Sequence, residues 1–372
     1  MKIGILTQPL KTNYGGLLQA YALQKTLKDL GHEAWIIDRD YSKLSFKKKV
    51  FNEIKRKIPI GGFSFQPNVK EKKIIGQHTT YFKNKYIGPR TEKFTQSSEM
   101  EKLNLLGFEA FIVGSDQVWR PRYSPGITNF FLDFAVNEPN KKRLSYAASF
   151  GVDQWEFSEE QTKDCSKLAR SFDAVSVREA SGINLSQEYL GVKAIHVLDP
   201  TMLLNIKDYL NLINVEGEPE SEGNLMTYVL DGTEEKEKFI NDVAINLEIT
   251  PFTIMQKEKL SGKTKIDDSI FPPVTKWLGG FMDAKFVITD SFHGCAFAIL
   301  FNKPFIALGN KKRGVARFTS LLKMFDLEER LILDNFTFKK SIVENTIDWE
   351  KVNSILKREQ DISLNFLKDN LN

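Results

Sequence analysis

One segment combines residue types that could transfer protons and bind a ligand. The apolar run at residues 286–289 stops at Asp290 and Ser291, and His293 and Gly294 follow before a second apolar run begins. This order predicts a strand, a turn and a buried helix, so the polar residues lie at the carboxyl end of a strand, where open α/β sheets bind their ligands. Histidine titrates near neutral pH and can serve as a general acid or base. We therefore expect His293 to transfer protons, while Asp290 and Ser291 orient its ring or contact substrate.

A purely structural interpretation of His293 competes with the catalytic one. In that interpretation the ring is partly buried and bonds only to its own turn, where serine and glycine are ordinary residues. Gly294 fits both interpretations, because a residue without Cβ also lets a ligand approach the amino end of the helix.

Polar residues also follow the strand predicted at residues 110–113. The loop after this strand contains Ser115, Asp116, Gln117 and Trp119. Since a tight turn needs fewer polar groups than this, we expect a loop that faces a ligand.

Arg178 and Glu179 follow the strand predicted at residues 174–177. The two could form a surface ion pair, which contributes little to stability. Alternatively, the guanidinium could hold a carboxylate or a phosphate through two parallel hydrogen bonds. The residues alone favour neither interpretation.

Asn13, Tyr14, Gly15 and Gly16 lie between the first predicted strand and the first predicted helix. They form either a turn with an asparagine cap or a backbone cradle for an anion at the helix N-terminus. The segment does not match the G-x-G-x-x-G fingerprint of dinucleotide-binding folds.

Two basic segments could contact anions. Arg313 and Arg317 follow the strand predicted at residues 305–308, and they form either a solvated basic turn or part of an anion site beside the cleft. Residues 47–57 interleave basic and apolar side chains. That pattern suits contact with anionic lipid or a plain surface helix.

Alternating elements position these polar residues. Residues 3–6 and 34–37 are predicted strands, and the helix between them has apolar residues at helical spacing. Such β-α-β units give parallel strands with a right-handed crossover. A second alternating set follows the acidic residues 215–224, and residues 349–371 form an amphipathic helix. The pattern predicts an α/β protein with two Rossmann-like domains and a C-terminal helix.

The predicted domain boundaries follow from these breaks in the pattern. We place the N-terminal domain at residues 1–214, with an insertion at about 43–90, and the linker at 215–224. The C-terminal domain spans residues 225–345, and the helical tail at 346–372 is expected to pack back on the N-terminal domain.

The overall composition excludes several classes of protein. The net charge of +4, from 52 basic and 48 acidic residues, is too small to indicate nucleic-acid binding. Cys165 and Cys295 form no metal-type pair, so we expect reduced thiols, no metal and a cytoplasmic location. The N-terminus lacks a signal-peptide pattern, and no apolar run approaches the ~20 residues of a membrane span.

Taken together and in order, seven segments resemble the polysaccharide pyruvyl transferase family. They are spread over most of the chain, and the ordered set is more specific than any one of them. The segments are residues 13–16, 19–23, 113–119, 145–151, 176–179, 198–201 and 290–294.

The resemblance implies a GT-B-like arrangement with the active site between the domains. It implies phosphoenolpyruvate as the donor and a glycan or lipid-linked sugar as the acceptor, with a pyruvate ketal as the product and no cofactor. By similarity, His293 is the catalytic histidine and Arg178 a donor-binding arginine. Contact with the inner face of the membrane is compatible with a lipid-linked acceptor. The residues specify neither the acceptor sugar nor the oligomeric state.

The chain departs from the family at one position. Characterised members often carry Arg-Leu-His at the turn, whereas this chain has Ser291 followed by Phe292 and His293. Either Arg313 or Arg317 supplies the missing cation, or the donor differs. A glycosyltransferase that uses a nucleotide sugar is the alternative enzyme, and a non-catalytic glycan-binding protein is the third hypothesis.

Overall fold

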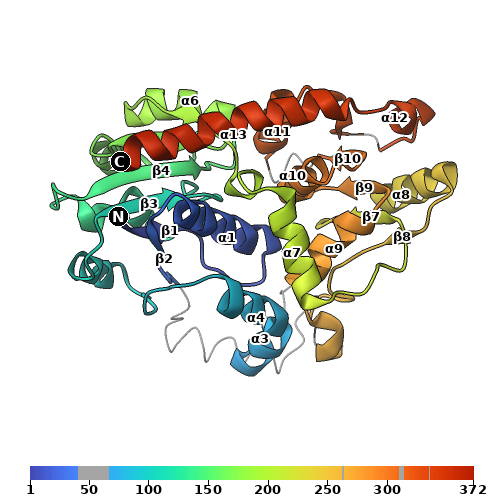
Figure 1. The fold of residues 1–372 in the computed structure, drawn as a ribbon, viewed down its shortest axis with the longest axis horizontal. Helices are drawn as coiled ribbons and strands as arrows, with labels where there is room; N and C mark the ends of the chain where they lie inside the picture. The colour runs from blue at the N-terminus through green and yellow to red at the C-terminus, as the bar shows by residue number, and fades with distance from the viewer. Residues whose placement is uncertain (41–66, 262–263, 310–313, 335) are drawn as a thin grey trace.

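Two parallel sheets form the framework of the protein (Figure 1). The computed structural model describes residues 1–40, 67–261, 264–309, 314–334 and 336–372. Within them, the first sheet has the order β2-β1-β3-β4-β5-β6 and the second the order β11-β10-β9-β7-β8. The strands of the first sheet are β1 (Lys2–Leu6), β2 (Glu33–Ile36), β3 (Ala110–Gly114), β4 (Lys142–Ala148), β5 (Ala174–Val177) and β6 (Ile195–His196). Those of the second are β7 (Leu225–Tyr228), β8 (Pro251–Phe252), β9 (Phe286–Thr289), β10 (Phe305–Leu308) and β11 (Leu331–Ile332).

Helices cover both sheets, as expected for parallel strands joined by crossovers. In the first half they are α1 (Tyr14–Asp29), α3 (Val69–Ile75), α4 (Gln77–Tyr86), α5 (Glu159–Ala169) and α6 (Ala180–Leu185), with α7 (Ile206–Glu216) leading to the second half. In the second half they are α8 (Glu234–Leu247), α9 (Val274–Asp283), α10 (Phe292–Leu300), α11 (Ala316–Met324), α12 (Lys340–Glu344) and the long α13 (Trp349–Leu371). The two-half α/β organisation predicted from the sequence is confirmed.

The inner strands explain why the two sheets form. All five residues of β3 and all four of β9 and β10 are buried. Strands buried on both faces are typical of parallel sheets covered by helices on both sides. The predicted insertion contains α3 and α4 in its described part, whereas residues 41–66 lie outside the described residues. The basic face predicted at residues 47–57 falls in that excluded segment.

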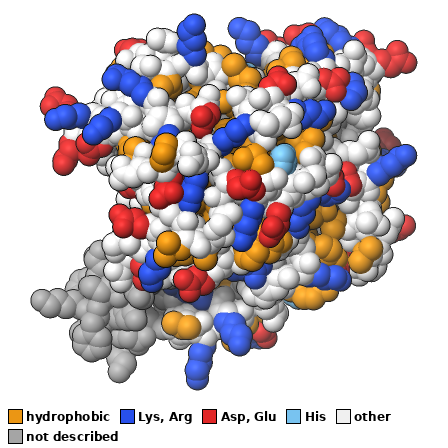
Figure 2. Space-filling model, turned by 60° about the vertical axis from the view of Figure 1, so that its left-hand side comes forward, with side chains coloured by type: hydrophobic (Ala, Val, Ile, Leu, Met, Phe, Trp, Pro, Cys, Tyr) orange, Lys and Arg blue, Asp and Glu red, His pale blue; other side chains and the backbone are white. Residues whose placement is uncertain are grey.

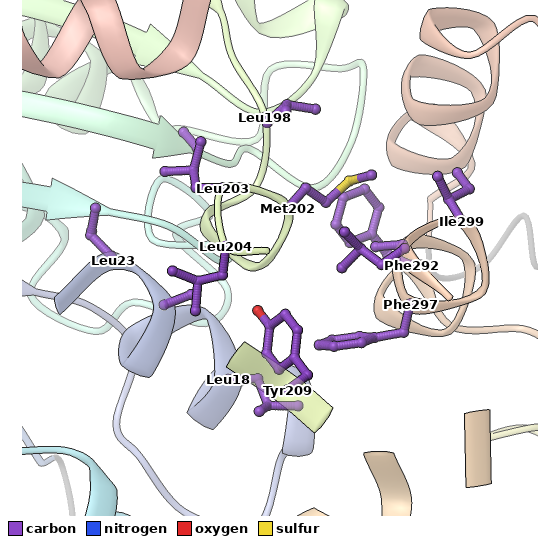
Figure 3. Packing of buried hydrophobic residues seen from close by; sticks show 14 of the residues in the cluster. Leu18, Leu23, Leu198, Met202, Leu203, Leu204, Tyr209, Phe292, Phe297 and Ile299 are labelled. Atoms are coloured by element: carbon purple, nitrogen blue, oxygen red, sulfur yellow. The ribbon is translucent and has the colours of Figure 1, made fainter. Parts of the chain in front are cut away.

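A continuous hydrophobic core joins the two halves (Figure 3). It contains Leu18 from α1, Met202 from the 3₁₀ turn η5 (Pro200–Met202), Tyr209 from α7 and Phe297 from α10. The rings of Tyr209 and Phe297 meet edge to face, with centroids 5.0 Å apart. Because this one cluster draws on residues of both halves, the halves pack against each other in this structure.

The C-terminal helix α13 runs along both halves (Figure 1). Near its start, Lys351 forms an ion pair with Asp326, two residues after the end of α11. Near its end, Ser363 Oγ accepts a hydrogen bond of 3.0 Å from the Leu198 amide, and Phe366 packs against Tyr146 of β4. The helix therefore packs back on the N-terminal half from an origin in the C-terminal half.

The surface carries no large patch of a single charge on the face seen in Figure 2, where basic and acidic side chains are intermixed. Within the described residues, no helix is both long and apolar enough to cross a bilayer.

Leu367 provides a test of how far α13 stabilises the fold. Its side chain is fully buried, so Leu367→Ala should lower the free energy of unfolding by about 3 kcal/mol through lost burial and a residual cavity. Ile362 of the same helix is 43% exposed, and Ile362→Ala should change stability by less than about 0.5 kcal/mol. Urea unfolding of both variants measures the difference. Equal stabilities would mean that α13 is not held by its buried face.

Candidate active site

His293 lies in the first turn of α10, directly after β9. Ser291 caps the helix, with its Oγ accepting from the Gly294 amide at 3.5 Å. Thr289 Oγ1 accepts from the Ser291 amide and donates to the carbonyl of Tyr228. An ideal Cβ built on Gly294 would lie 2.1 Å from Thr289 Oγ1. Gly294 thus serves the packing of this turn, and the space beside its Cα is filled by Thr289 and not open to a ligand.

The His293 ring lies at the junction of the two halves. Its Nδ1 faces Gly15 of α1, where an ideal Cβ would lie only 2.0 Å from that nitrogen. Its Nε2 faces Asp199 Oδ2 at 3.7 Å, and no hydrogen-bond partner for Nε2 exists among the described residues. The residue is 6% exposed. A histidine of the second half is therefore held against two elements of the first.

Asp199 joins more groups of the site than any other carboxylate described here. Its Oδ2 accepts from Arg178 Nη1 at 2.8 Å and from Ser115 Oγ at 3.0 Å. Its Oδ1 accepts from the amide and hydroxyl of Thr201 at 3.0 and 2.8 Å. Burial alone would raise the pKa of the Asp199 carboxyl, but the neighbouring His293 and Arg178 outweigh it and hold this pKa well below its usual range.

Sequence reasoning did not place Asp199 in the site. Asp199 belongs only to the family-like segment 198–201. It follows the apolar run at residues 197–198, as Arg178 follows the strand predicted at 174–177, and this shared position after an apolar run is the available signal.

Arg178 is a buried arginine with one open edge. Its Nη1 is held by Asp199, and its guanidinium stacks over the Phe292 ring at 4.7 Å. Its Nε and Nη2, which lie on the same edge of the guanidinium, have no hydrogen-bond partner among the described residues. The nearest carboxylate to that edge is Asp116, whose Oδ1 is 3.6 Å from Nη2. Because an unpaired buried donor is costly, this edge suits a carboxylate or phosphate bound in two-pronged fashion.

Arg317 brings a second guanidinium to this region from the other half. It lies at the start of α11, which meets the start of α6 through a hydrogen bond from the Ala180 amide to Ser320 Oγ. Its Nε is buried without a hydrogen-bond partner in the described part of the chain. Burial and the charge of Arg178 lower the pKa of Arg317 to about 10. Arg313, the other cation predicted here, lies outside the described residues.

Glu179 is buried beside the two arginines. Its Oε1 accepts from Ser149 Oγ and, at 3.2 Å, from the Gly151 amide, so it orders the loop after β4. Its Oε2 has no hydrogen-bond partner among the described residues.

Asp290 has partners different from those predicted. Its carboxylate accepts from the amides of Leu230 and Asp231 at 2.6 and 3.0 Å and forms a buried ion pair of 2.7 Å with Lys236. It braces the loop between β7 and α8, and the carboxylate that faces His293 is Asp199. The structure therefore gives no support to Asp290 as the group that orients the histidine.

The segment Asn13, Tyr14, Gly15, Gly16 also differs from the predicted ligand loop. Asn13 Oδ1 accepts from the Gly16 amide, which is the asparagine cap of the structural alternative. The Tyr14 ring is buried, and its hydroxyl donates to the carbonyl of Pro272 at 2.8 Å. Gly15 alone contacts the site, through the His293 ring.

The loop after β3 contributes unequally. Ser115 donates to Asp199 and Asp116 approaches Arg178, as described above. Gln117 Oε1 accepts from Arg120 Nη1 at 3.0 Å. Trp119 is fully buried, donates to the carbonyl of Phe130 and stacks on Phe131, so it belongs to the hydrophobic core.

The described side chains contain no group of three or more His, Cys, Asp or Glu residues arranged for a metal ion. The site instead gathers arginine, histidine and carboxylate groups from the carboxyl ends of β3, β5, β6 and β9. Such a set can hold an anion and move protons next to it.

Gly15 provides a direct test of this geometry. Gly15→Ala should lower the free energy of unfolding by about 2 kcal/mol, because the new methyl group would overlap the His293 ring. Gly16→Ala is the matched control, since its nearest neighbour would lie at an ordinary 3.4 Å. Adding His293→Ala to Gly15→Ala should recover stability, as measured by urea unfolding. Failure of that recovery would show that the glycine serves something other than the histidine.

Proteins of known structure share the two-sheet α/β fold described above. The chain resembles a UDP-GlcNAc 2-epimerase from Neisseria meningitidis, solved with UDP-GlcNAc bound, with a TM-score of 0.52 and 12% identity over 100% of both chains. Two other structures are less similar. A UDP-GlcNAc 2-epimerase from Methanocaldococcus jannaschii has a TM-score of 0.46 and 12% identity over 97% of this chain and 94% of its own. A mutant O-GlcNAc transferase from Thermobaculum terrenum has a TM-score of 0.46 and 10% identity over 99% of this chain and 66% of its own.

The first likeness confirms the predicted GT-B-like arrangement of two Rossmann-like domains. A comparison with curated protein sequences gives no match. The sequence model for polysaccharide pyruvyl transferase, however, matches residues 13–312, which is most of the chain and includes every described site residue except Arg317. The protein therefore belongs to the polysaccharide pyruvyl transferase family.

Proposed function

We propose that the protein transfers the pyruvyl group of phosphoenolpyruvate to a sugar of a surface polysaccharide or a lipid-linked glycan precursor, forming a pyruvate ketal. Family membership supports a pyruvyl transferase in polysaccharide biosynthesis. The open guanidinium edge of Arg178, buried beside His293, is the observation that carries the donor assignment. We expect the reaction in the cytoplasm, and contact with the inner face of the membrane stays a prediction.

The donor carries two anionic groups, and the site offers two arginines. The Nε and Nη2 donors of Arg178 would hold the carboxylate or the phosphate. Arg317 would meet the other group, because its unpaired Nε lies in the same buried region. This assignment also accounts for Ser291 at the position where characterised relatives often carry arginine: the missing cation comes from α11 instead.

His293 is the proton-transfer group in this proposal. Ketal formation adds one proton to the methylene carbon of the donor and removes two protons from sugar hydroxyls, one of which leaves with the phosphate. The protonated ring of His293, an imidazolium, can deliver the proton to carbon. The scheme uses no metal and no cofactor, and phosphoenolpyruvate enters as a substrate.

The first test measures donor binding. A ligand that binds only the folded state should stabilise it by about 2.7 kcal/mol at a concentration of 100 times Kd. We expect phosphoenolpyruvate to raise the melting temperature and Arg178→Lys to weaken this affinity about tenfold or more, because lysine keeps the charge but loses the two-pronged edge.

Arg330→Lys is the matched control for that substitution. Arg330 is a buried arginine of the second half that bonds to the carbonyl of Asn345, far from the site in sequence and partners. The Arg330→Lys variant should have a changed free energy of unfolding but an unchanged affinity for phosphoenolpyruvate. Stabilisation by UDP or GDP in place of phosphoenolpyruvate would instead support the glycosyltransferase alternative.

The second test separates binding from chemistry. His293→Gln should bind phosphoenolpyruvate with an affinity close to that of the wild type but lose about 100- to 10,000-fold in turnover, as expected for a lost general acid. Turnover is measured as phosphate released in the presence of an acceptor glycan. Wild-type turnover in this variant would remove His293 from the mechanism.

A further inference from the structure

Four carboxylates lie around the proposed donor site or in the turn that carries His293, and their side chains differ in exposure to solvent. Glu179 is fully buried, and the side chains of Asp199 and Asp290 have no exposed area. Asp116 differs because 12% of its side chain is exposed. It is therefore the carboxylate of this set that a substrate can reach without displacing the protein around it.

Asp116 is also held firmly in place. Its backbone is in the left-handed region, with φ at +63°, a conformation that aspartate and asparagine tolerate better than most residues. Its carbonyl accepts from the amides of Val118 and Ser149 at 2.7 and 3.1 Å, and its Oδ1 accepts from the Gln117 amide at 2.9 Å. These bonds aim the carboxylate at the open edge of Arg178 before any ligand arrives.

The position of Asp116 creates an electrostatic conflict with the donor. Its Oδ1 lies 3.6 Å from Arg178 Nη2, so an anion bound to the open edge of that guanidinium would face a carboxylate at close range. Like charges at such a distance repel. A hydroxyl group beside Asp116 can donate its one proton to that carboxylate, which leaves an oxygen lone pair free to face C2 of the donor.

We propose that Asp116 is the catalytic base that accepts the proton of the acceptor hydroxyl, and this inference rests on the proposed function. In the first step, His293 in its protonated form gives a proton to C3 of phosphoenolpyruvate while the hydroxyl oxygen bonds to C2 and its proton passes to Asp116. In the second step, the second hydroxyl oxygen bonds to C2, the C2–O bond to phosphate breaks, and the hydroxyl proton leaves on the phosphate. Asp116 then loses its proton to solvent and His293 regains one.

The proposal predicts opposite changes in binding and in turnover. Asp116→Asn keeps the backbone conformation and removes the negative charge. It should bind inorganic phosphate and phosphoenolpyruvate severalfold more tightly in a thermal-shift titration, because the repulsion is gone. Turnover with an acceptor should fall about 100-fold or more. Asp116→Gly, which also suits a positive φ, should behave alike if the asparagine variant folds poorly.

The exposed Asp153 supplies the matched control. Asp153→Asn removes one negative charge from the loop after β4 and should leave both affinity and turnover at the wild-type level. Wild-type turnover in Asp116→Asn would overturn the proposal, and so would weaker phosphate binding, which would make Asp116 a brace for Arg178. If the wild-type protein itself fails to bind phosphoenolpyruvate, the proposed function falls and this inference falls with it.

Discussion

The ion pair between Arg178 and Asp199 is the interaction on which the site depends. Both side chains are almost completely removed from solvent, and their closest atoms are 2.8 Å apart. Burying two charges is costly, and the attraction between them offsets the cost only when the remaining hydrogen-bonding capacity is also used. Ser115 and Thr201 supply the other bonds to Asp199. Three loops, those after β3, β5 and β6, are thereby tied to one carboxylate.

That ion pair also fixes the orientation of the Arg178 guanidinium. With Nη1 bound to Asp199 and the ring of Phe292 against its face, the guanidinium has little freedom to rotate. Its open edge is therefore oriented in advance, which reduces the entropy lost when a ligand binds. Five buried atoms, on Arg178, Glu179, His293 and Arg317, have no hydrogen-bond partner among the described residues, and they come from both halves of the molecule. Unpaired buried groups are rare in folded proteins, and their concentration in one place is typical of a binding site.

The fold could be read from the sequence more completely than the site. Buried parallel strands are continuous apolar runs, so β3, β9 and β10 are predictable from the order of apolar residues, as is α13 from its helical spacing. Which side chains contact each other in the site was not predictable in this way. Asp199 and Asp290 both follow strands, and only the packing of the two halves decides which one faces His293. Trp119 and Tyr14 each combine one polar atom with a large apolar ring, so their residue type fits either a ligand-facing loop or the core. Tertiary packing buries both of them in the core.

The contact between Gly15 and His293 constrains how this enzyme can be recombined. His293 is encoded in the second half of the chain, but the space for its ring is made by a missing side chain in the first. A chimera that joins the N-terminal half of one relative to the C-terminal half of another would assemble a working centre only if both parents place a glycine and a histidine at these two positions. Compatibility of the parents at this one pair is therefore a criterion for choosing them, independent of their overall similarity.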